Sequence, residues 1–182
     1  PGETQEDLKQ IVHLSYKLAK LRKKIDNKTA NINVAVSWLV PKPHTPLGWL
    51  GQRPEEYFKT AKQVILDEKF KLRAGFLQFK FHNIQCSILE SAIGRGDRRL
   101  GKVIEEAWRN GARFDLWSEM FNYQIWEEAF AKYEMNINKQ AEKSFAEDEI
   151  LPWEHLGGPE KSYVLDHYRQ AMQLCECDLD VK

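Results

Sequence analysis

The feature that most constrains the fold is the stretch of residues 31–49, Asn-Ile-Asn-Val-Ala-Val-Ser-Trp-Leu-Val followed by Pro-Lys-Pro-His-Thr-Pro-Leu-Gly-Trp. In its first half, bulky apolar side chains alternate with smaller or polar ones, which is the two-residue period of a β-strand. The bulky face suits packing on helices. The other face, which holds Asn33, Ala35 and Ser37, suits a wall that faces a cavity or a ligand. Prolines then end the strand, because proline lacks an N–H group. We expect either a site at the end of this strand or an edge strand followed by a proline-rich connector.

Composition excludes several classes of function. The 182 residues suit one domain or a piece of a larger one. With 27 acidic and 27 basic residues the net charge is zero, which argues against a dominant nucleic-acid or membrane-surface interaction. No apolar run is long enough to span a membrane and no signal peptide is present. Three cysteines, Cys86, Cys175 and Cys177, provide no disulfide framework, so we expect a cytoplasmic protein.

The order of the elements predicts an α/β fold that gives way to helices. Thr4 with Asp7 predicts a capped helix over residues 4–25, and the strand described above follows it. A helix over residues 54–69 and a strand over residues 71–82 complete a helix–strand–helix–strand order. We therefore expect two regions, residues 1–83 and residues 84–182. Because the chain opens with Pro1 directly before a helix cap, we interpret it as a fragment whose upstream strands are missing.

The second region is predicted to be helical throughout. Ser87 and Glu90 suggest a capping box of a short helix, and Asp97 suggests the N-cap of the next. Residues 116–133 are expected to form an aromatic helix, and we assign its aromatic stripe to the core. A loose polar helix is expected over residues 134–150, a loop over residues 151–158 and a last helix over residues 159–174.

A charged glycine segment is the sharpest candidate for ligand binding. Residues 95–99 read Arg-Gly-Asp-Arg-Arg, so three guanidinium groups lie beside a flexible backbone at a helix N-terminus. This combination favours an anion site formed by Arg95, Arg98 and Arg99. The alternative is that Asp97 caps the helix and the arginines form surface ion pairs.

A second candidate is Trp153-Glu154-His155, which lies in a loop rich in proline and glycine. Trp153 suits a buried aromatic anchor, whereas His155 could transfer a proton or contact a polar ligand. The histidines and cysteines show no spacing typical of a metal site, so we expect no metal ligands in this chain. Phosphate-binding loops, serine-hydrolase elbows and zinc-protease motifs are likewise missing from the sequence.

Together these segments resemble radical S-adenosylmethionine (radical SAM) enzymes. Pro-Gly-Glu-Thr at residues 1–4 is similar to the segment after the fifth barrel strand of that family. Leu-Val-Pro-Lys-Pro-His-Thr-Pro at residues 39–46 is similar to the exit of the sixth strand. Three downstream segments resemble an uncharacterised B12-binding-type subfamily, namely residues 95–100, residues 111–117 and residues 151–155. The resemblance covers nearly the whole chain.

The resemblance implies a fold and cofactors. The fold would be the C-terminal portion of a partial (β/α)6 TIM-like barrel, followed by a mostly helical C-terminal extension. A [4Fe-4S] cluster and S-adenosylmethionine would generate a 5′-deoxyadenosyl radical, and cobalamin is a possible further cofactor. By position, Pro1, Gly2 and Glu3 would lie beside the adenosyl group, and Ser37 would face the barrel lumen near the adenine.

The chain departs from the family in one respect. The Cys-x-x-x-Cys-x-x-Cys loop that binds the cluster does not occur in these 182 residues. We therefore expect the chain to be inactive without the N-terminal part of the same protein. The substrate is unknown. The candidates for contacting the substrate are Arg95, Asp97, Arg98, Arg99, Asp115 and His155. The competing hypothesis is a non-catalytic helical module whose tryptophan-rich helices bind a partner protein.

Overall fold

The computed structural model describes residues 1–180, with side chains as far as Cys175, so the side chain of Cys177 lies outside the described residues. It contains two compact units. The first unit consists of Pro1–Trp38 and Glu55–His82. The second consists of Leu39–Pro54 and the chain from Asn83 onward. The two regions expected from the sequence, residues 1–83 and 84–182, stay a prediction, because compactness by itself does not define a domain.

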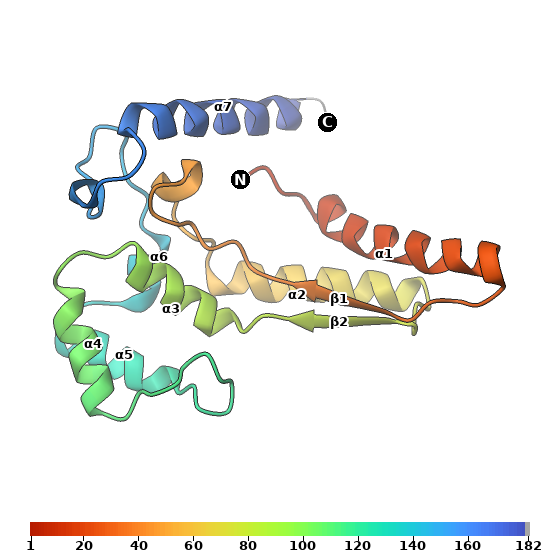
Figure 1. The fold of residues 1–182 in the computed structure, drawn as a ribbon, viewed down its shortest axis with the longest axis horizontal. Helices are drawn as coiled ribbons and strands as arrows, with labels where there is room; N and C mark the ends of the chain where they lie inside the picture. Colours follow the sequence, from red (N-terminus) through yellow and green to blue (C-terminus); the bar gives the residue numbers. More distant parts are fainter. Residues whose placement is uncertain (181–182) are drawn as a thin grey trace. The chain divides into compact units, whose positions relative to one another are not determined.

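The first unit has the predicted helix–strand–helix–strand order (Figure 1). Its elements are α1 (Gln5–Asp26), β1 (Ile32–Val36), α2 (Glu55–Lys71) and β2 (Leu77–Phe81). The two strands form a parallel sheet in which Ile32 pairs with Leu77 and Val36 pairs with Phe81. A parallel pair joined by a helix is the basic unit of α/β proteins, so the expected mixed α/β character is confirmed at this level.

Local sequence explains how α1 begins. The side chain of Thr4 accepts a hydrogen bond from the backbone N–H of Asp7, and the backbone N–H of Thr4 donates to Asp7 Oδ2 over 2.7 Å. This reciprocal arrangement is the predicted capping box. Asn27 ends the helix in the left-handed conformation with φ of 60°. Asparagine tolerates this conformation better than most residues.

The sheet has one apolar face and one polar face. Ile32, Val34 and Val36 are partly buried, whereas Asn33 and Ala35 are exposed. Their partners on β2 follow the same pattern, because Asn33 pairs with Gln78 and Ala35 with Lys80, both exposed. The apolar side contacts α2, where the ring of Trp38 lies 5.2 Å from that of Phe58. The helices α1 and α2 also pack against each other.

Both strands are shorter than the sequence predicted. The expected strand over residues 31–40 ends at Val36, because β2 ends at the paired Phe81 and supplies no further ladder. His82 closes the pairing by donating its N–H to the carbonyl of Val36 over 3.0 Å. The expected strand over residues 71–82 begins only at Leu77, since α2 continues to Lys71 and a turn follows it.

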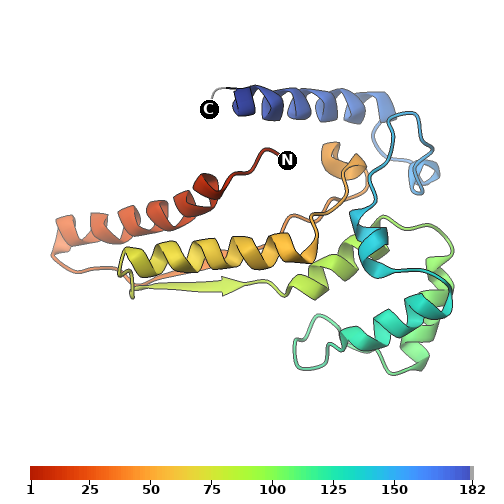
Figure 2. The same ribbon diagram turned by 180° about the vertical axis from the view of Figure 1, so that it is seen from behind.

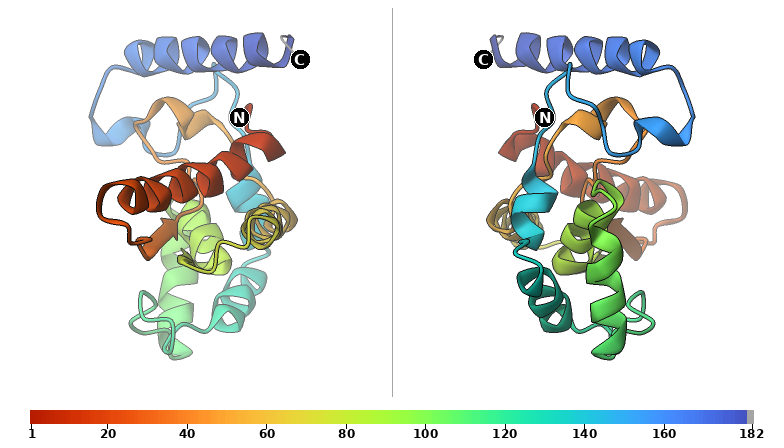
Figure 3. Two further views of the ribbon diagram at one scale, coloured as in Figure 1. Left: turned by 90° about the vertical axis from the view of Figure 1, so that its right-hand side faces the viewer. Right: turned by 90° about the vertical axis from the view of Figure 1, so that its left-hand side faces the viewer.

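The second unit is helical, as expected, and its described residues include two hydrophobic cores. Its elements in chain order are η1 (Pro46–Trp49), α3 (Ile84–Gly94), α4 (Leu100–Arg109), α5 (Tyr123–Lys132), α6 (Ile137–Glu142), η2 (Glu154–Leu156) and α7 (Lys161–Asp180). Figure 3 shows α4 and α5 side by side, and residues such as Val103, Trp126 and Phe130 form their shared core. A second core joins Trp49, Phe145, Leu151, Trp153 and Val164, and through it α7 packs on η1 (Figure 2).

Several helix boundaries expected in this unit are wrong. The helix α3 begins at Ile84 with Asn83 as its cap, so Ser87 lies inside the helix instead of capping it. The expected helix over residues 116–133 begins only at Tyr123, because the side chain of Asn122 caps the N–H of Gln124 over 3.1 Å. The expected helix over residues 134–150 shortens to α6, because Lys143 adopts an extended conformation.

The aromatic stripe is only partly core. Ala129 and Phe130 are buried, whereas Trp117 and Met120, which were expected in the same stripe, precede α5 and are exposed. Among the described residues no helix is both long enough and apolar enough to cross a membrane.

Candidate functional site

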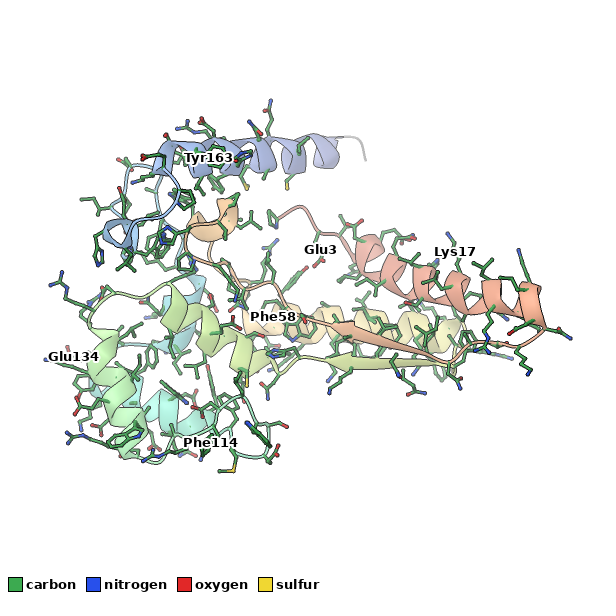
Figure 4. The ribbon with its side chains drawn as sticks, viewed as in Figure 1. Glu3, Lys17, Phe58, Phe114, Glu134 and Tyr163 are labelled. Atoms are coloured by element: carbon green, nitrogen blue, oxygen red, sulfur yellow. The ribbon has the colours of Figure 1, made fainter. Side chains whose placement is uncertain are left out.

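The first candidate site lies at the carboxyl end of the sheet in the first unit. The hydroxyl of Tyr57 donates a hydrogen bond to the carboxylate of Glu3, which joins the first turn of α2 to the segment that enters α1. Figure 4 shows Glu3 before α1 and Phe58 on α2. Ser37 follows β1 and is exposed, and its neighbour Trp38 contacts Phe58. The structure therefore brings Glu3 and Ser37 to the same end of this unit.

The entering segment has a backbone that requires glycine. Gly2 has φ of 72°, in the left-handed region that glycine adopts without a steric cost. Pro1 and Glu3 on either side are exposed. The residues that were expected beside the cofactor are thus polar and accessible at this end of the unit. Glu3 offers a carboxylate and Ser37 a hydroxyl.

Arg95 is not placed as a surface anion site requires. Its side chain is fully buried in the second unit and donates to the carbonyl oxygens of Ala141 over 3.0 Å and of Lys143 over 2.6 Å. Its guanidinium carbon also lies 5.0 Å from the ring centroid of Phe145. Burial lowers the pKa of Arg95 to about 10, so the group stays charged at neutral pH. Arg95 thereby ties α6 and the segment after it to the end of α3.

The other three charged residues of this segment lie at the surface. Asp97 forms an ion pair with Arg99, with Nη2 and Oδ2 2.8 Å apart. This contact lowers the pKa of Asp97, chiefly through the hydrogen bond from Arg99, and raises the pKa of Arg99. Asp97 also accepts from the backbone N–H of Arg99 over 2.9 Å, as a cap does, although α4 begins only at Leu100. Arg98 is exposed and forms no ion pair with a described residue.

Asp115 lies near the first turn of α3, at the opposite end of this helix from Arg95. Burial, together with the charge of Asp115, raises the pKa of the Cys86 thiol in the first turn of that helix. At 1.5 Å per residue, the nine residues from Cys86 to Arg95 span about 13 Å. One carboxylate oxygen of Asp115, Oδ1, is buried without a hydrogen-bond partner among the described residues. The structure therefore does not bring Asp115 together with Arg95.

A cavity of about 230 Å³ in the second unit lies between two segments that the sequence indicated as two separate candidate sites. One wall comes from the proline-rich exit loop, through His44 and Trp49. The opposite wall comes from the loop that holds Trp153 and continues to the N-terminus of α7. His155 lies in η2, is exposed and does not line the cavity.

Sequence reasoning did not identify the residues of this cavity as one site. It singled out the exit loop for its prolines and the second loop for Trp153. His44, Trp49 and Lys161 were not recognised as neighbours, because about a hundred residues separate the two segments in the chain. In the sequence, the two segments have in common only a tryptophan near proline and glycine. This pattern is too weak to predict that the segments contact each other.

The residues present do not fit an iron–sulfur cluster. Such a cluster needs several thiolates that converge on it, and Cys86 and Cys175 are the cysteines whose side chains are described. Within the described residues, no group of three His, Cys, Asp or Glu side chains could hold a metal ion.

Comparison with known proteins adds one relative. No family model matches the chain, and no solved structure matches it. The chain is similar to the uncharacterized protein MJ0966 of Methanocaldococcus jannaschii, with 26% identity over 105 residues. This alignment covers 58% of the present chain and 21% of the relative, so the chain spans about a fifth of the length of that protein.

Proposed function

We propose that this chain is part of a radical S-adenosylmethionine enzyme, in which the first unit is the end of a partial (β/α)6 barrel and the second is a helical extension. The observation that carries the proposal is the two-faced parallel sheet. Its apolar face contacts α2, and its other face shows Asn33, Ala35, Gln78 and Lys80. A barrel needs this division, because helices cover the outside and the inner face lines the lumen.

A second observation supports a larger barrel. Four apolar residues of α1 recur at spacings of four, three and four and are each more than half exposed, namely Leu14, Leu18, Leu21 and Ile25. The strand β1, which follows this helix, pairs only with β2 among the described strands. An additional strand and helix on this side would cover both the free strand edge and the apolar stripe.

Residues at the carboxyl end of the sheet would bind the cofactor in this proposal. Bound S-adenosylmethionine would supply a 5′-deoxyadenosyl radical. The segment of Pro1, Gly2 and Glu3 would lie along the adenosyl group, where Gly2 lets the backbone approach closely. Ser37 would offer its hydroxyl from the lumen side. The cluster ligands would come from another part of the protein, since Cys86 and Cys175, the cysteines whose side chains are described, do not fit the cluster.

The substrate-side residues belong to the second unit. Arg98, Asp115 and His155 are accessible at least in part, and we propose that they contact the substrate together with Asp97 and Arg99. Arg95 would act by positioning, since its guanidinium is engaged with backbone carbonyls. Replacing Arg98 and Arg99 with glutamine in the full-length enzyme should lower activity while leaving stability unchanged. Unchanged activity would remove these two residues from the proposed site.

Iron content tests the assignment. After anaerobic reconstitution with iron and sulfide, we expect no stoichiometric iron in the 182-residue chain and about four irons per chain in the full-length protein. The coding sequence upstream of Pro1 provides an independent check, since it should contain a Cys-x-x-x-Cys-x-x-Cys loop. Full-length protein that binds no iron, or an upstream sequence without that loop, would contradict the proposal.

A second candidate function is a helical module that binds a partner protein. The observation that favours it is the apolar segment before α5. Four of its side chains are each more than half exposed, namely Phe114, Leu116, Trp117 and Met120. Figure 4 labels Phe114 in this segment. The module predicts that the full-length protein binds no cluster and that replacing Leu116 and Trp117 with serine abolishes binding of its partner. The iron content of the full-length protein distinguishes the two candidate functions, because only the radical S-adenosylmethionine enzyme should bind iron.

A further inference from the structure

The net charge of zero conceals two units of opposite charge. The first unit holds 13 basic and 8 acidic side chains, whereas the rest of the chain holds 14 basic and 19 acidic ones. Physiological salt screens exposed charges that lie more than about 8 Å apart. A binding partner therefore responds to the charges of the surface that it touches, and the first unit presents a basic surface.

The carboxylates of the first unit are all engaged within that unit. Each accepts a hydrogen bond or forms an ion pair, namely Glu3 with Tyr57, Glu6 with Lys9, Asp7 with Thr4, Asp26 with Arg22, Glu55 and Glu56 with Lys59, Asp67 with Gln63, and Glu68 with His13 and Lys71. These contacts occupy four of the 13 cations. The other nine form no ion pair with a described residue.

Seven of these nine cations lie at the amino-terminal end of the sheet, where α1 and α2 finish and both strands begin (Figure 1). We call them the cationic end, which consists of Lys17, Lys20, Lys23, Lys24, Lys28, Lys69 and Arg73. Lys20 shows how close the elements are, since its Nζ lies 5.1 Å from the ring centroid of Tyr16 and 5.9 Å from that of Phe76, directly before β2. Figure 4 labels Lys17 on α1.

Helix dipoles explain only part of this arrangement. Lys23, Lys24 and Lys69 lie in the last turns of their helices, where a cation is stabilised by the negative end of the dipole. Lys28 and Arg73 follow the helices and are exposed. Like charges gathered on one surface repel one another, and an anionic ligand that binds there removes this repulsion.

An exposed aromatic ring lies beside these cations. Phe70 is 84% exposed in the last turn of α2 and follows Lys69 in the chain. Bases of a single strand stack on such rings while its phosphates pair with lysine and arginine. An anionic bilayer also attracts lysine but needs an apolar anchor as a second signal. In the proposed barrel, additional elements cover the apolar stripe of α1, so Phe70 alone would have to serve as that anchor.

We infer that the cationic end binds single-stranded nucleic acid. Phosphate groups pair with Lys17 and Lys24, which lie two helical turns or about 10 Å apart on one side of α1, and a base stacks on Phe70. The inference goes beyond the proposed enzymatic function, because the cationic end lies at the opposite end of the sheet from Glu3 and Ser37.

Binding of an oligonucleotide to the full-length protein tests the inference. The probe is a fluorescent oligouridylate of about 12 nucleotides, within the size range of single-strand sites, and anisotropy measures its affinity at several salt concentrations. Replacing both Lys17 and Lys24 with glutamine should lower the affinity about five- to twentyfold. The slope of log affinity against log salt should become shallower by about 1.4, because each phosphate contact contributes about 0.7.

The matched control replaces Lys102 and Lys139 with glutamine. Both are exposed, lie in α4 and α6, and form no ion pair with a described residue. This control should change neither the affinity nor the salt slope. Equal losses in the two double variants, or no measurable binding by the parent protein, would overturn the inference.

A further variant tests the aromatic ring. Phe70→Ala should lower the affinity about five- to a hundredfold, because one stacked base is worth about 1–3 kcal/mol, whereas the salt slope should stay the same. Ile150→Ala is the control, since Ile150 is 83% exposed outside the first unit, and it should have no effect. Unchanged affinity in Phe70→Ala would contradict the proposed stacking.

Two other polyanions test the choice of ligand. Phosphatidylserine vesicles offer a bilayer, and polyglutamate offers the charge of an acidic protein. We expect both to compete with the oligouridylate more weakly than the unlabelled oligouridylate does. Tighter binding of either one would overturn the assignment to nucleic acid. These measurements need no iron–sulfur cluster, so their outcome is separate from that of the enzymatic proposal.

Discussion

The buried guanidinium of Arg95 donates a 2.6 Å hydrogen bond to the carbonyl oxygen of Lys143. This contact joins the end of α3 to the segment that follows α6, and a second bond to Ala141 reinforces it. The carbonyls at the end of a helix have no partner within the helix, so a buried cation that donates to this region is stabilising. The arginine segment that looked like a ligand site therefore contains at least one structural residue.

Replacing Arg95 tests this role. Arg95→Met keeps much of the side-chain volume but removes the donors. The carbonyl oxygen of Lys143 then loses its bond to Arg95, and that of Ala141 keeps only the N–H of Gln52. We expect the free energy of unfolding to fall by about 2–4 kcal/mol in chemical denaturation. Arg98→Met is the matched control, since Arg98 is exposed, and should change stability by less than about 0.5 kcal/mol. Equal effects of the two substitutions would show that Arg95 has no special role.

The pair of Glu68 and His13 predicts how the first unit responds to acid. Oε1 of Glu68 lies 2.8 Å from Nε2 of His13, and this hydrogen bond lowers the pKa of Glu68 from its ordinary 4.5. Because the folded pKa is the lower one, the carboxylate contributes stability that is fully present above pH 4.5 and is lost as the pH falls through the folded pKa.

Glu68→Gln should therefore be less stable than the parent chain at pH 7 and should lose less stability between about pH 5 and pH 3. Urea denaturation at three pH values measures this difference. The control is Asp67→Asn, because Asp67 is exposed and accepts only from Gln63 on the same helix in the described structure. Parallel pH profiles for Glu68→Gln and the parent chain would contradict the role of the pair.

Two glycines of the second unit should respond to alanine in opposite directions. A Cβ atom on Gly51 would lie 2.0 Å from the carbonyl oxygen of Glu142, which is backbone and cannot turn away. Gly51→Ala should lower the free energy of unfolding by about 1–3 kcal/mol. Gly101 lies in α4 with no atom within 4 Å of its Cβ position, so Gly101→Ala should raise stability by about 0.4–1 kcal/mol. Thermal denaturation of both variants checks the signs, and a tolerated Gly51→Ala would refute the close contact.

The sequence alone predicted the parts of the fold that depend on local patterns. Alternation placed β1, and the Thr4–Asp7 box placed the start of α1, because both follow from neighbouring residues. The length of β1 was overestimated, since a strand continues only while a partner pairs with it, and β2 ends at Phe81. In the same way Asn122 begins α5 later than its aromatic stripe suggested.

The candidate sites were harder to predict, because they depend on contacts between distant segments. Nothing in the residues around Arg95 indicates that it is buried, since its neighbours Asp97 and Arg99 form an ordinary surface pair. The cavity at Trp49 depends on a loop more than a hundred residues further along the chain. A pattern that is read along one segment cannot supply such contacts.

The central claim is that this chain belongs to a radical S-adenosylmethionine enzyme, and cofactor cleavage tests it most directly. Full-length protein, purified and reconstituted without oxygen, is incubated with S-adenosylmethionine and a strong reductant, and 5′-deoxyadenosine is measured by liquid chromatography. We predict its formation, a slower rate for the variants Ser37→Ala and Glu3→Gln, and none with the 182-residue chain alone. Absence of 5′-deoxyadenosine from full-length protein that contains a complete cluster would contradict the claim.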